Sequence, residues 1–299
     1  MDADRPAGPA DAPDADDWQL TDDLDDFLGR AGDFLSSRPA LHTVPLTVTD
    51  ALRRRGTGMY GDEPPQYGIL GEHTGGVRGV WFRTPPFPVN ITPLTAADAE
   101  ALAAHLAERG LPVPDVMAER DTAEAFAKEW ERLTGATAEL RERERLYRLT
   151  ELTPPRPAPE GRPRVAGPAD RDLLIRWHTE FKEAAGLRAG QPAEQWADAR
   201  IAYGGITLWE TPDGTPVSMA GATPEIAGQV RLAPVYTLAH LRGRGYAGAV
   251  TAAVSAAAVA SGVTEVLLFT DLANPTSNAL YQRLGYREVA DFAVYGFGE

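Results

Sequence analysis

The sequence predicts a mixed α/β fold divided into two domains. Its 299 residues are enough for two hydrophobic cores of ordinary size. Segments with strand patterns alternate with helical ones along both halves, as in sheets flanked by helices. The stretch Thr153–Arg164 contains five prolines, which prevent regular backbone pairing, so we place the domain boundary there. The expected division is a tail over 1–20, a first domain over 21–152, a linker over 153–164 and a second domain over 165–299.

The composition is that of a globular protein and excludes several classes of function. Apolar residues make up 43% of the chain and charged residues 24%. The net charge is −14, but the first 26 residues, with ten Asp and one Arg, carry −9 of it, so the acidity belongs mainly to the tail. Without a basic face, nucleic acid is not an expected partner. Because there is no cysteine, disulfides, thiolate zinc sites and Cys nucleophiles are excluded, and no metal is implied.

The N-terminal residues point to a cytoplasmic protein with no membrane partner. They have neither the basic nor the apolar segment of a signal peptide. No run in the chain approaches the ~18 apolar residues of a membrane span. Residues 1–20, rich in Asp, Ala and Pro, are expected to be disordered.

The first domain is expected to combine helices with a hairpin. Thr21 is a suitable N-cap for the first helix. The turn HTGG joins two strands, the second of which ends before Pro85 and Pro86. Two later helices each end at a glycine. The expected helices are Asp22–Ser36, Leu46–Arg55, Ala96–Arg109 and Thr122–Thr134, and the expected strands are Gln66–Glu72, Val77–Arg83, one ending near Thr92, and Ala136–Leu149.

The second domain is expected to run in the order β, α, α, three strands, α, β, α, β, β. The turn PDGT separates two of its strands. A long Ala-rich helix follows the loop after the third strand of the set and ends at Gly262. The expected helices are Asp170–Ala185, Pro192–Tyr203, the Ala-rich helix and Pro275–Leu284, and the expected strands lie near Val165, at Ile206–Glu210, Val217–Ala222, Gln229–Thr237 and Glu265–Thr270, with two short strands at the C-terminus.

The loop between the strand Gln229–Thr237 and the Ala-rich helix carries the strongest chemical signal. Unpaired N–H groups at a helix start, together with the helix dipole, attract an anion. Glycines let the backbone approach a phosphate closely and adopt positive φ, and arginines add positive charge. The loop therefore predicts a pyrophosphate cradle, although a ligand-free helix entry would have the same residues. Its residues are Arg242, Gly243, Arg244, Gly245, Tyr246 and Ala247.

This loop resembles the acetyl-CoA signature of the GNAT superfamily of N-acetyltransferases. That signature is an Arg or Gln, two residues, Gly, one residue, then Gly or Ala, here Arg242, Gly245 and Ala247. Some thirty residues on, the run from Asn274 to Tyr286 (NPTSNALYQRLGY) resembles the second signature of the family. The resemblance implies that Asn274 lies against the cofactor and that Tyr281 lies beside the CoA sulfur.

Helical spacing places Asn274, Asn278 and Tyr281 on one face, so we expect all three at the cofactor. The resemblance makes Tyr281 the general acid that protonates the departing thiolate. Reference pKa values of about 10 for Tyr and about 8.5 for a thiol make that transfer uphill by about 1.5 units. The plainer interpretations are that Asn274 is an N-cap and that Tyr281 is a packed aromatic residue.

The strand before the loop, Gln229–Thr237, resembles the splayed fourth strand of the family. The resemblance implies that its main chain, at Val235, Tyr236 and Thr237, contacts the pantetheine arm of the cofactor and polarises the thioester. Many members of the family carry a Glu there as general base, but no acid occurs between Gln229 and Thr237. The remaining candidates, which leave the base unassigned, are Glu180, Glu183 and Glu225.

The first domain resembles the degenerate half of two-domain GNAT proteins. Where a cradle should follow its strand near Thr92, the residues are PLTAAD, without glycine or arginine. The resemblance implies two tandem GNAT-like domains, each a twisted, mostly antiparallel sheet flanked by helices, with only the second binding acetyl-CoA.

The implied function is direct transfer of an acetyl group from acetyl-CoA to an amine acceptor, a small molecule or a peptide, in a ternary complex. The alternatives are a non-catalytic acyl-CoA sensor and, on the acidic tail alone, a partner-binding protein. The sequence leaves the acceptor and the oligomeric state open.

Overall fold

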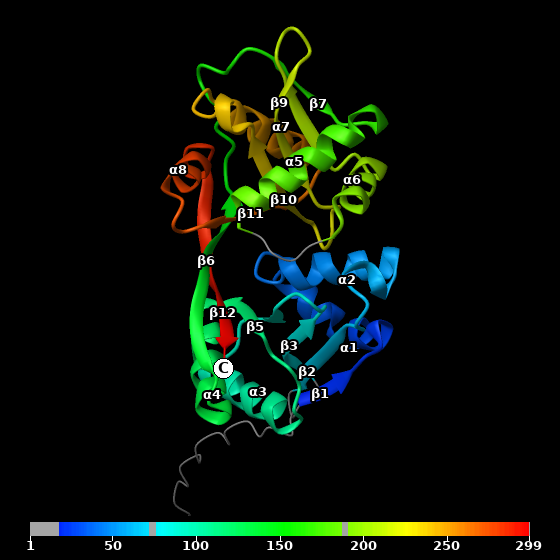
Figure 1. Ribbon diagram of the computed structural model, residues 1–299, viewed down its shortest axis with the longest axis vertical. Coiled ribbons are helices and arrows are strands. Elements are labelled where there is room, and N and C mark those ends of the chain that lie inside the picture. The colour runs from blue at the N-terminus through cyan, green and yellow to red at the C-terminus, as the bar shows by residue number, and fades with distance from the viewer. Residues whose placement is uncertain (1–17, 72–75, 187–190, 299) are drawn as a thin grey trace, which may run out of the picture.

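The computed structural model describes residues 18–71, 76–186 and 191–298 (Figure 1). The predicted disorder of residues 1–17 lies outside this range, as do residues 73–75 of the predicted HTGG turn. In the described chain, twelve strands form one continuous sheet in the order β1-β2-β3-β4-β5-β12-β6-β11-β10-β9-β8-β7. The strands are β1 Trp18–Thr21, β2 Gln66–Gly71, β3 Val77–Arg83, β4 Val89–Ile91, β5 Asp115–Glu119, β6 Thr137–Leu149, β7 Arg162–Val165, β8 Ile206–Glu210, β9 Pro216–Ala222, β10 Gln229–Thr237, β11 Glu265–Asp271 and β12 Tyr286–Gly298.

Helices cover both faces of this sheet in each half of the chain (Figure 1). In the N-terminal half, α1 and α2 pack on one face around Phe27 and Tyr67, and α3 and α4 pack on the other around Trp81 and Phe126. In the C-terminal half, α5 and α6 form a core with Met219, opposite α7 and α8. The helices are α1 Leu24–Ser37, α2 Thr43–Arg55, α3 Ala96–Glu108, α4 Arg120–Thr134, α5 Arg171–Ala184, α6 Ala193–Ala202, α7 Tyr246–Ala260 and α8 Pro275–Arg283. These bounds confirm the predicted helices to within a few residues.

Two long strands, β6 and β12, run through both halves (Figure 1). Strand β6 pairs with β11, while β12 pairs along its whole length with β6 and, over Phe292–Gly296, with β5. The prediction of two short C-terminal strands was wrong, because β12 continues through register shifts after Glu288 and Val294. The last strand of the chain therefore completes the sheet of the N-terminal half.

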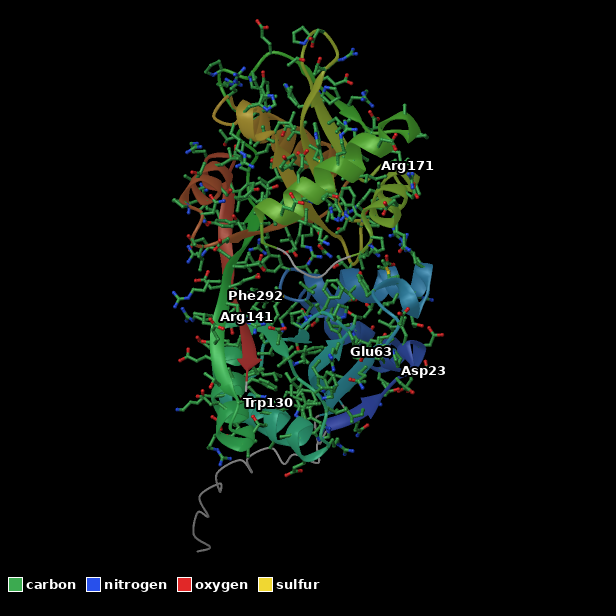
Figure 2. All side chains as sticks on the ribbon, viewed as in Figure 1. Asp23, Glu63, Trp130, Arg141, Arg171 and Phe292 are labelled. Atoms are coloured by element: carbon green, nitrogen blue, oxygen red, sulfur yellow. The ribbon has the colours of Figure 1, made fainter. Side chains whose placement is uncertain are left out.

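Side-chain contacts stabilise β6 and β12 where they pass from one half to the other. Arg141 of β6 reaches over β12 to an ion pair with Asp115 of β5. A Cβ on Gly296 of β12 would overlap Cζ of Arg141, so a larger residue there would displace that guanidinium. Figure 2 labels Arg141 and also Phe292 of β12, which packs edge-on against Phe269 of β11 with ring centres 5.1 Å apart. The two halves thus share strands and a small core.

Two segments differ from the predicted tail and linker. Strand β1 lies inside the predicted disordered tail, where Trp18 is 2% exposed and pairs opposite Leu70. Strand β7 begins inside the Pro-rich segment, whose backbone is anchored where Trp209 Nε1 donates to the carbonyl of Glu160 at 3.1 Å. Burial of one indole ring in each case outweighs the local composition.

Helix α2 of the N-terminal half contacts β10 on the face that α5 and α6 cover. Its Thr43 Oγ1 donates to Gln229 Oε1 at 3.0 Å, and Arg231 Nη2 donates to Thr47 Oγ1 at 3.0 Å. Both contacts join β10 to the other half of the molecule. The C-terminal half therefore has α2 as a wall on the side of its sheet that α5 and α6 cover.

Candidate active site

Strand β10 separates from β11 halfway along its length. The two strands pair in parallel only over Gln229–Leu232 and Glu265–Leu268. Beyond Leu232, β10 shifts register against β9 and continues as Val235–Thr237 paired with β9 alone. A Cβ on Gly221 of β9 would collide with the carbonyl of Ala233, so the irregularity requires glycine there. The main chain of β10 after Leu232 thus faces an opening in the sheet.

The loop after β10 has the geometry expected of an anion cradle. Gly243 has φ +78 and Gly245 has φ +85, a region that other residues rarely adopt. A Cβ on Gly243 would meet no atom within 4 Å, so the space beside it is open. The side chains of Arg242 and Arg244 are exposed on either side of this glycine, and Arg242 Nε donates to the carbonyl of Thr237 at 3.3 Å.

Helix α7 begins at this loop without a side-chain cap. Its N-cap residue is Gly245, and no side chain of the described residues accepts from its first turn. The N–H groups of that turn and the positive end of the helix dipole therefore point out of the protein. The Pro-rich segment borders the loop, since a Cβ on Gly245 would lie 3.7 Å from Cδ of Pro159.

The opening and the loop belong to one cleft with a volume of about 1740 Å³. Ten of the twelve predicted site residues line it, and those outside are Arg244 and Asn278. The cleft continues past β10 to α5, α6, β6 and α2. The ten are Val235, Tyr236, Thr237, Arg242, Gly243, Gly245, Tyr246, Ala247, Asn274 and Tyr281.

The two asparagines of α8 have structural contacts. Asn274 is the N-cap, with Oδ1 accepting from the Ser277 N–H at 3.0 Å. Asn278 Nδ2 donates to the carbonyl of Asp271 at 2.8 Å, and its Oδ1 accepts from Tyr147 at 3.0 Å. Asn278 therefore fastens α8 to β11 and β6, which is why it lies outside the cleft despite its helical spacing from Tyr281.

Tyr281 lies where the cleft meets the core under α7 and α8. It is 7% exposed and packs edge-on against Tyr286, with ring centres 6.0 Å apart. Its hydroxyl forms no hydrogen bond with the described residues, and burial raises the pKa of the phenol to about 12. Proton transfer from this hydroxyl to a thiolate is then uphill by about 3.5 units, more than the reference values suggest.

Of the three acids considered as general base, none lines the cleft, and only Glu180 contacts a residue that does. Glu180 of α5 accepts a 2.6 Å hydrogen bond from the hydroxyl of Tyr236, and the pKa of that phenol is raised to about 12 by burial and by this bond. Glu183 and Glu225 are exposed and do not line the cleft.

Glu144, which the sequence did not single out, lines the cleft from β6. Burial raises its pKa to about 7, with Glu142 and Asp271 adding to the shift and Arg231 opposing it. The strand pattern of β6 places Glu142, Glu144 and Leu146 on one face. The signal that was missing is the pairing of β6 with β11, which brings this face to the cleft.

A histidine and a tryptophan form the far wall of the cleft. His178 of α5 stacks on Trp196 of α6 with ring centres 4.1 Å apart. Burial lowers the pKa of His178 to about 4, so the ring is neutral at pH 7. Arg171 at the start of α5, labelled in Figure 2, pairs with Asp198 of α6 at 2.6 Å and holds the two helices together.

Neither metal-binding groups nor membrane helices were found in the part of the chain that the structure describes. No group of three or more His, Asp or Glu side chains there could hold a metal ion. Across residues 18–71, 76–186 and 191–298, no helix is both long and apolar enough to cross a bilayer.

Comparison with known proteins matches the C-terminal half to a family model and the overall fold to solved structures. Residues 171–286 match the model of the acetyltransferase (GNAT) family. No curated protein sequence matches the chain. A GCN5-related N-acetyltransferase from Sphaerobacter thermophilus superposes with a TM-score of 0.62 at 18% identity, covering 94% of this chain and 95% of that one.

Two further solved structures share the fold over the whole chain. An acetyltransferase of the GNAT family from Colwellia psychrerythraea has a TM-score of 0.57 at 12% identity, covering 94% of this chain and 99% of that one. A tandem GNAT protein from the clavulanic acid biosynthesis pathway has a TM-score of 0.56 at 11% identity, covering 93% and 97%. At these identities the likeness establishes the fold alone.

Proposed function

We propose, from the match of residues 171–286 to the acetyltransferase (GNAT) family, that the protein transfers an acetyl group from acetyl-CoA to an amine in a ternary complex. The observation that carries the proposal is the junction of the uncapped α7 N-terminus with the splayed part of β10 in one cleft. A reaction in the cytoplasm is part of the proposal, because the chain has no cysteine.

The cofactor would occupy the cleft from the loop to the opening in the sheet. The pyrophosphate would accept hydrogen bonds from N–H groups at Gly243 to Ala247, with Arg242 and Arg244 adding charge. The pantetheine arm would run along the free edge of β10 at Val235–Thr237 as a strand would. Asn274 would border it from α8, and Asn278 would act indirectly by fixing α8.

The reaction would be a direct displacement at the thioester carbonyl. The amine nitrogen attacks the carbonyl carbon, the C–S bond breaks, and the nitrogen loses a proton while the thiolate gains one. Tyr281 would donate the proton to sulfur, since it is protonated at all working pH values and its hydroxyl has no partner among the described residues.

Glu144 would accept the proton of the amine. A general base works best when its pKa lies near the operating pH, and the pKa of Glu144 is about 7. It lines the cleft on the side of α2 and β6, away from the cofactor loop.

A direct test is the release of free CoA thiol from acetyl-CoA in the presence of a library of amines. Acetyl transfer predicts steady, amine-dependent release at a rate proportional to enzyme concentration. Tight binding of acetyl-CoA with no release for any amine would instead identify the chain as an acyl-CoA sensor.

A further inference from the structure

The cleft contains an arginine without an acidic partner. Arg231 of β10 is half-buried and lines the cleft. Its Nη2 donates to Thr47 Oγ1 of α2 at 3.0 Å, and its guanidinium lies 5.9 Å from the ring centre of Phe269. It forms no ion pair with any described residue, unlike Arg164, which contacts Asp170 at 2.7 Å and Glu210 at 2.6 Å.

The surroundings of Arg231 favour an anion beside it. Burial lowers the pKa of the guanidinium to about 10, which reflects the cost of desolvating the charge. Of the nearby groups, Tyr60 and Glu144 offset this shift and Arg200 adds to it. A desolvated cation is stabilised when a carboxylate completes its hydrogen bonds. No carboxylate among the described residues forms an ion pair with it.

Arg231 is held in position relative to the reacting carbonyl. It precedes the splayed part of β10 on the same strand, and the bond to Thr47 fixes the guanidinium against α2. Val235 lies four residues further on, about 13 Å along an extended strand. An acceptor with its amine at the opening in the sheet would thus extend toward Arg231.

On the premise of the proposed acetyl transfer, we propose that Arg231 binds a carboxylate of the acceptor, so that the substrates are amines with a carboxylate at the end opposite the reacting nitrogen. A carboxylate matches the planar guanidinium of Arg231, because its two oxygens can accept parallel hydrogen bonds. Glu144 and Asp271, which also line the cleft, attract the ammonium end of the acceptor.

The test uses ω-amino acids with two to seven methylenes and the matching ω-amino carboxamides as acceptors. Thiol release with the wild-type protein should give a kcat/KM at least about tenfold higher for the carboxylate at the best length, as expected for hydrogen bonds to a charged group. In Arg231→Met the kcat/KM for the carboxylate divided by that for the carboxamide should fall to near one. Arg231→Lys, which keeps a cation, should retain part of the preference for the carboxylate.

Thr47→Val is the matched control for structural damage. It removes the same hydrogen bond between α2 and β10 but keeps the guanidinium, so most of the preference for the carboxylate should remain. If Thr47→Val abolished the preference as fully as Arg231→Met, Arg231 would be a contact between the halves and the assignment would be wrong. Melting temperatures of all variants report folding independently.

A binding measurement separates this inference from the proposed function. Calorimetry with hexanoate and hexanamide on the protein without acetyl-CoA should show at least about tenfold tighter binding of hexanoate, lost in Arg231→Met. That result would stand even if no amine were acetylated, in which case the proposed function alone fails. Equal affinities, or binding of neither compound, would overturn the role of Arg231, as would equal kcat/KM values for the paired acceptors.

Discussion

Helices α3 and α7 occupy corresponding places in the two halves, each following a strand that has a parallel neighbour, β4 with β5 and β10 with β11. The N-terminus of α3 is filled by its own chain. Thr95 caps it and donates to Asp98 at 2.7 Å, and Asp98, 3% exposed, pairs with Arg78 at 2.7 Å. The N-terminus of α7 has no such cap, since Gly245 stands there.

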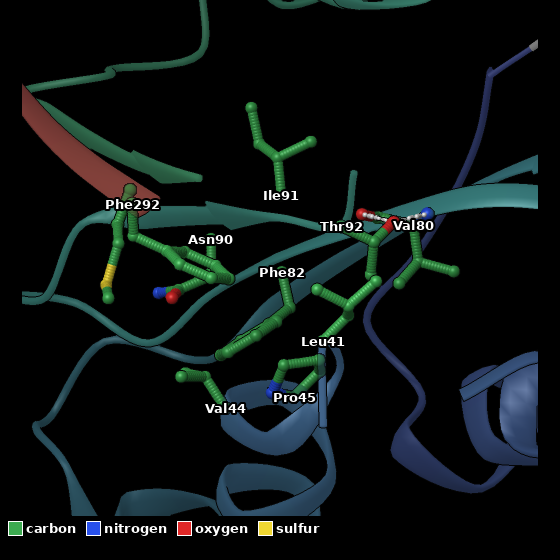
Figure 3. A pocket seen from close by; sticks show the side chains of 10 residues that line it. Leu41, Val44, Pro45, Val80, Phe82, Asn90, Ile91, Thr92 and Phe292 are labelled. Atoms are coloured by element: carbon green, nitrogen blue, oxygen red, sulfur yellow. Dashed lines mark hydrogen bonds between the residues drawn. The ribbon is translucent and has the colours of Figure 1, made fainter. Parts of the chain in front are cut away.

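The strands before these helices also differ, because the end of β4 is closed by a side chain, whereas β10 faces an opening after Leu232. Thr92, after β4, bonds through Oγ1 to the N–H of Val80 at 2.9 Å and to its carbonyl at 3.1 Å, which closes the strand end onto β3 (Figure 3). The neighbouring pocket, between Val44, Phe82 and Phe292, has a volume of about 10 Å³, room for about one water molecule.

The comparison teaches that a helix N-terminus attracts an anion in either half, but that the anion can come from the chain itself. Asp98 provides it in the N-terminal half. In the C-terminal half the place is left for a ligand, and we propose the pyrophosphate of acetyl-CoA.

Gly245→Asp should produce the largest effect, because it places a carboxylate at α7 as Asp98 does at α3. The variant should lose at least about 100-fold in acetyl-CoA affinity, by charge and by the φ of +85. Gly245→Asn, which tolerates this φ equally well, is the matched control and should lose much less. Calorimetry of the wild type should give one acetyl-CoA site per chain. A second site, or equal losses in the two variants, would contradict the comparison.

Tyr281→Phe should lower kcat by at least about 10²-fold while acetyl-CoA affinity stays within twofold. The ring and its packing on Tyr286 remain, so the melting temperature should hardly change. Rates under single-turnover conditions are the measurement. An unchanged rate when chemistry is limiting would leave Tyr281 as a packed aromatic residue.

Glu144→Gln should lower kcat/KM by about tenfold or more and change its pH profile. The wild-type rate should rise with pH through about 7, as Glu144 loses its proton, and flatten above. In the variant this inflection should be missing. The charged groups that face this carboxyl are Glu142, Asp271 and Arg231. Because the charge of Glu142 raises the pKa of Glu144, the control Glu142→Gln should keep the inflection and shift it to lower pH. A wild-type inflection that survives in Glu144→Gln would assign the base elsewhere.

Asp98→Asn should affect stability and leave acetyl-CoA binding unchanged. Loss of the buried charge opposite Arg78 should cost about 2 kcal/mol of unfolding free energy, measured by urea titration. Glu129→Gln, which breaks an exposed pair with Arg132, should cost much less. Any change in acetyl-CoA affinity on Asp98→Asn would mean that the halves are energetically coupled at this site.

The sequence was sufficient for local features and insufficient for distant pairings. Most helix ends and the positive φ of Gly243 and Gly245 follow from residue types within a few positions. The predicted N-cap Thr21 was wrong, because Asp23 caps α1, and the irregular β10 was expected only from the family resemblance. The course of β12 depends on its pairing with β6, and the paired residues lie about 150 positions apart in the sequence. Glu144 was missed for the same reason, and Asn278 because its partners Tyr147 and Asp271 come from other strands.

The place of β12 between β5 and β6 has a consequence for synthesis of the protein. In the part of the chain that the structure describes, β5 and β6 do not pair directly, so the N-terminal half cannot complete its sheet until β12 has left the ribosome. Until then both strands keep exposed edges, which favours aggregation and binding of chaperones. We therefore expect slow folding after translation, and expect that a fragment ending near Leu149 does not fold alone.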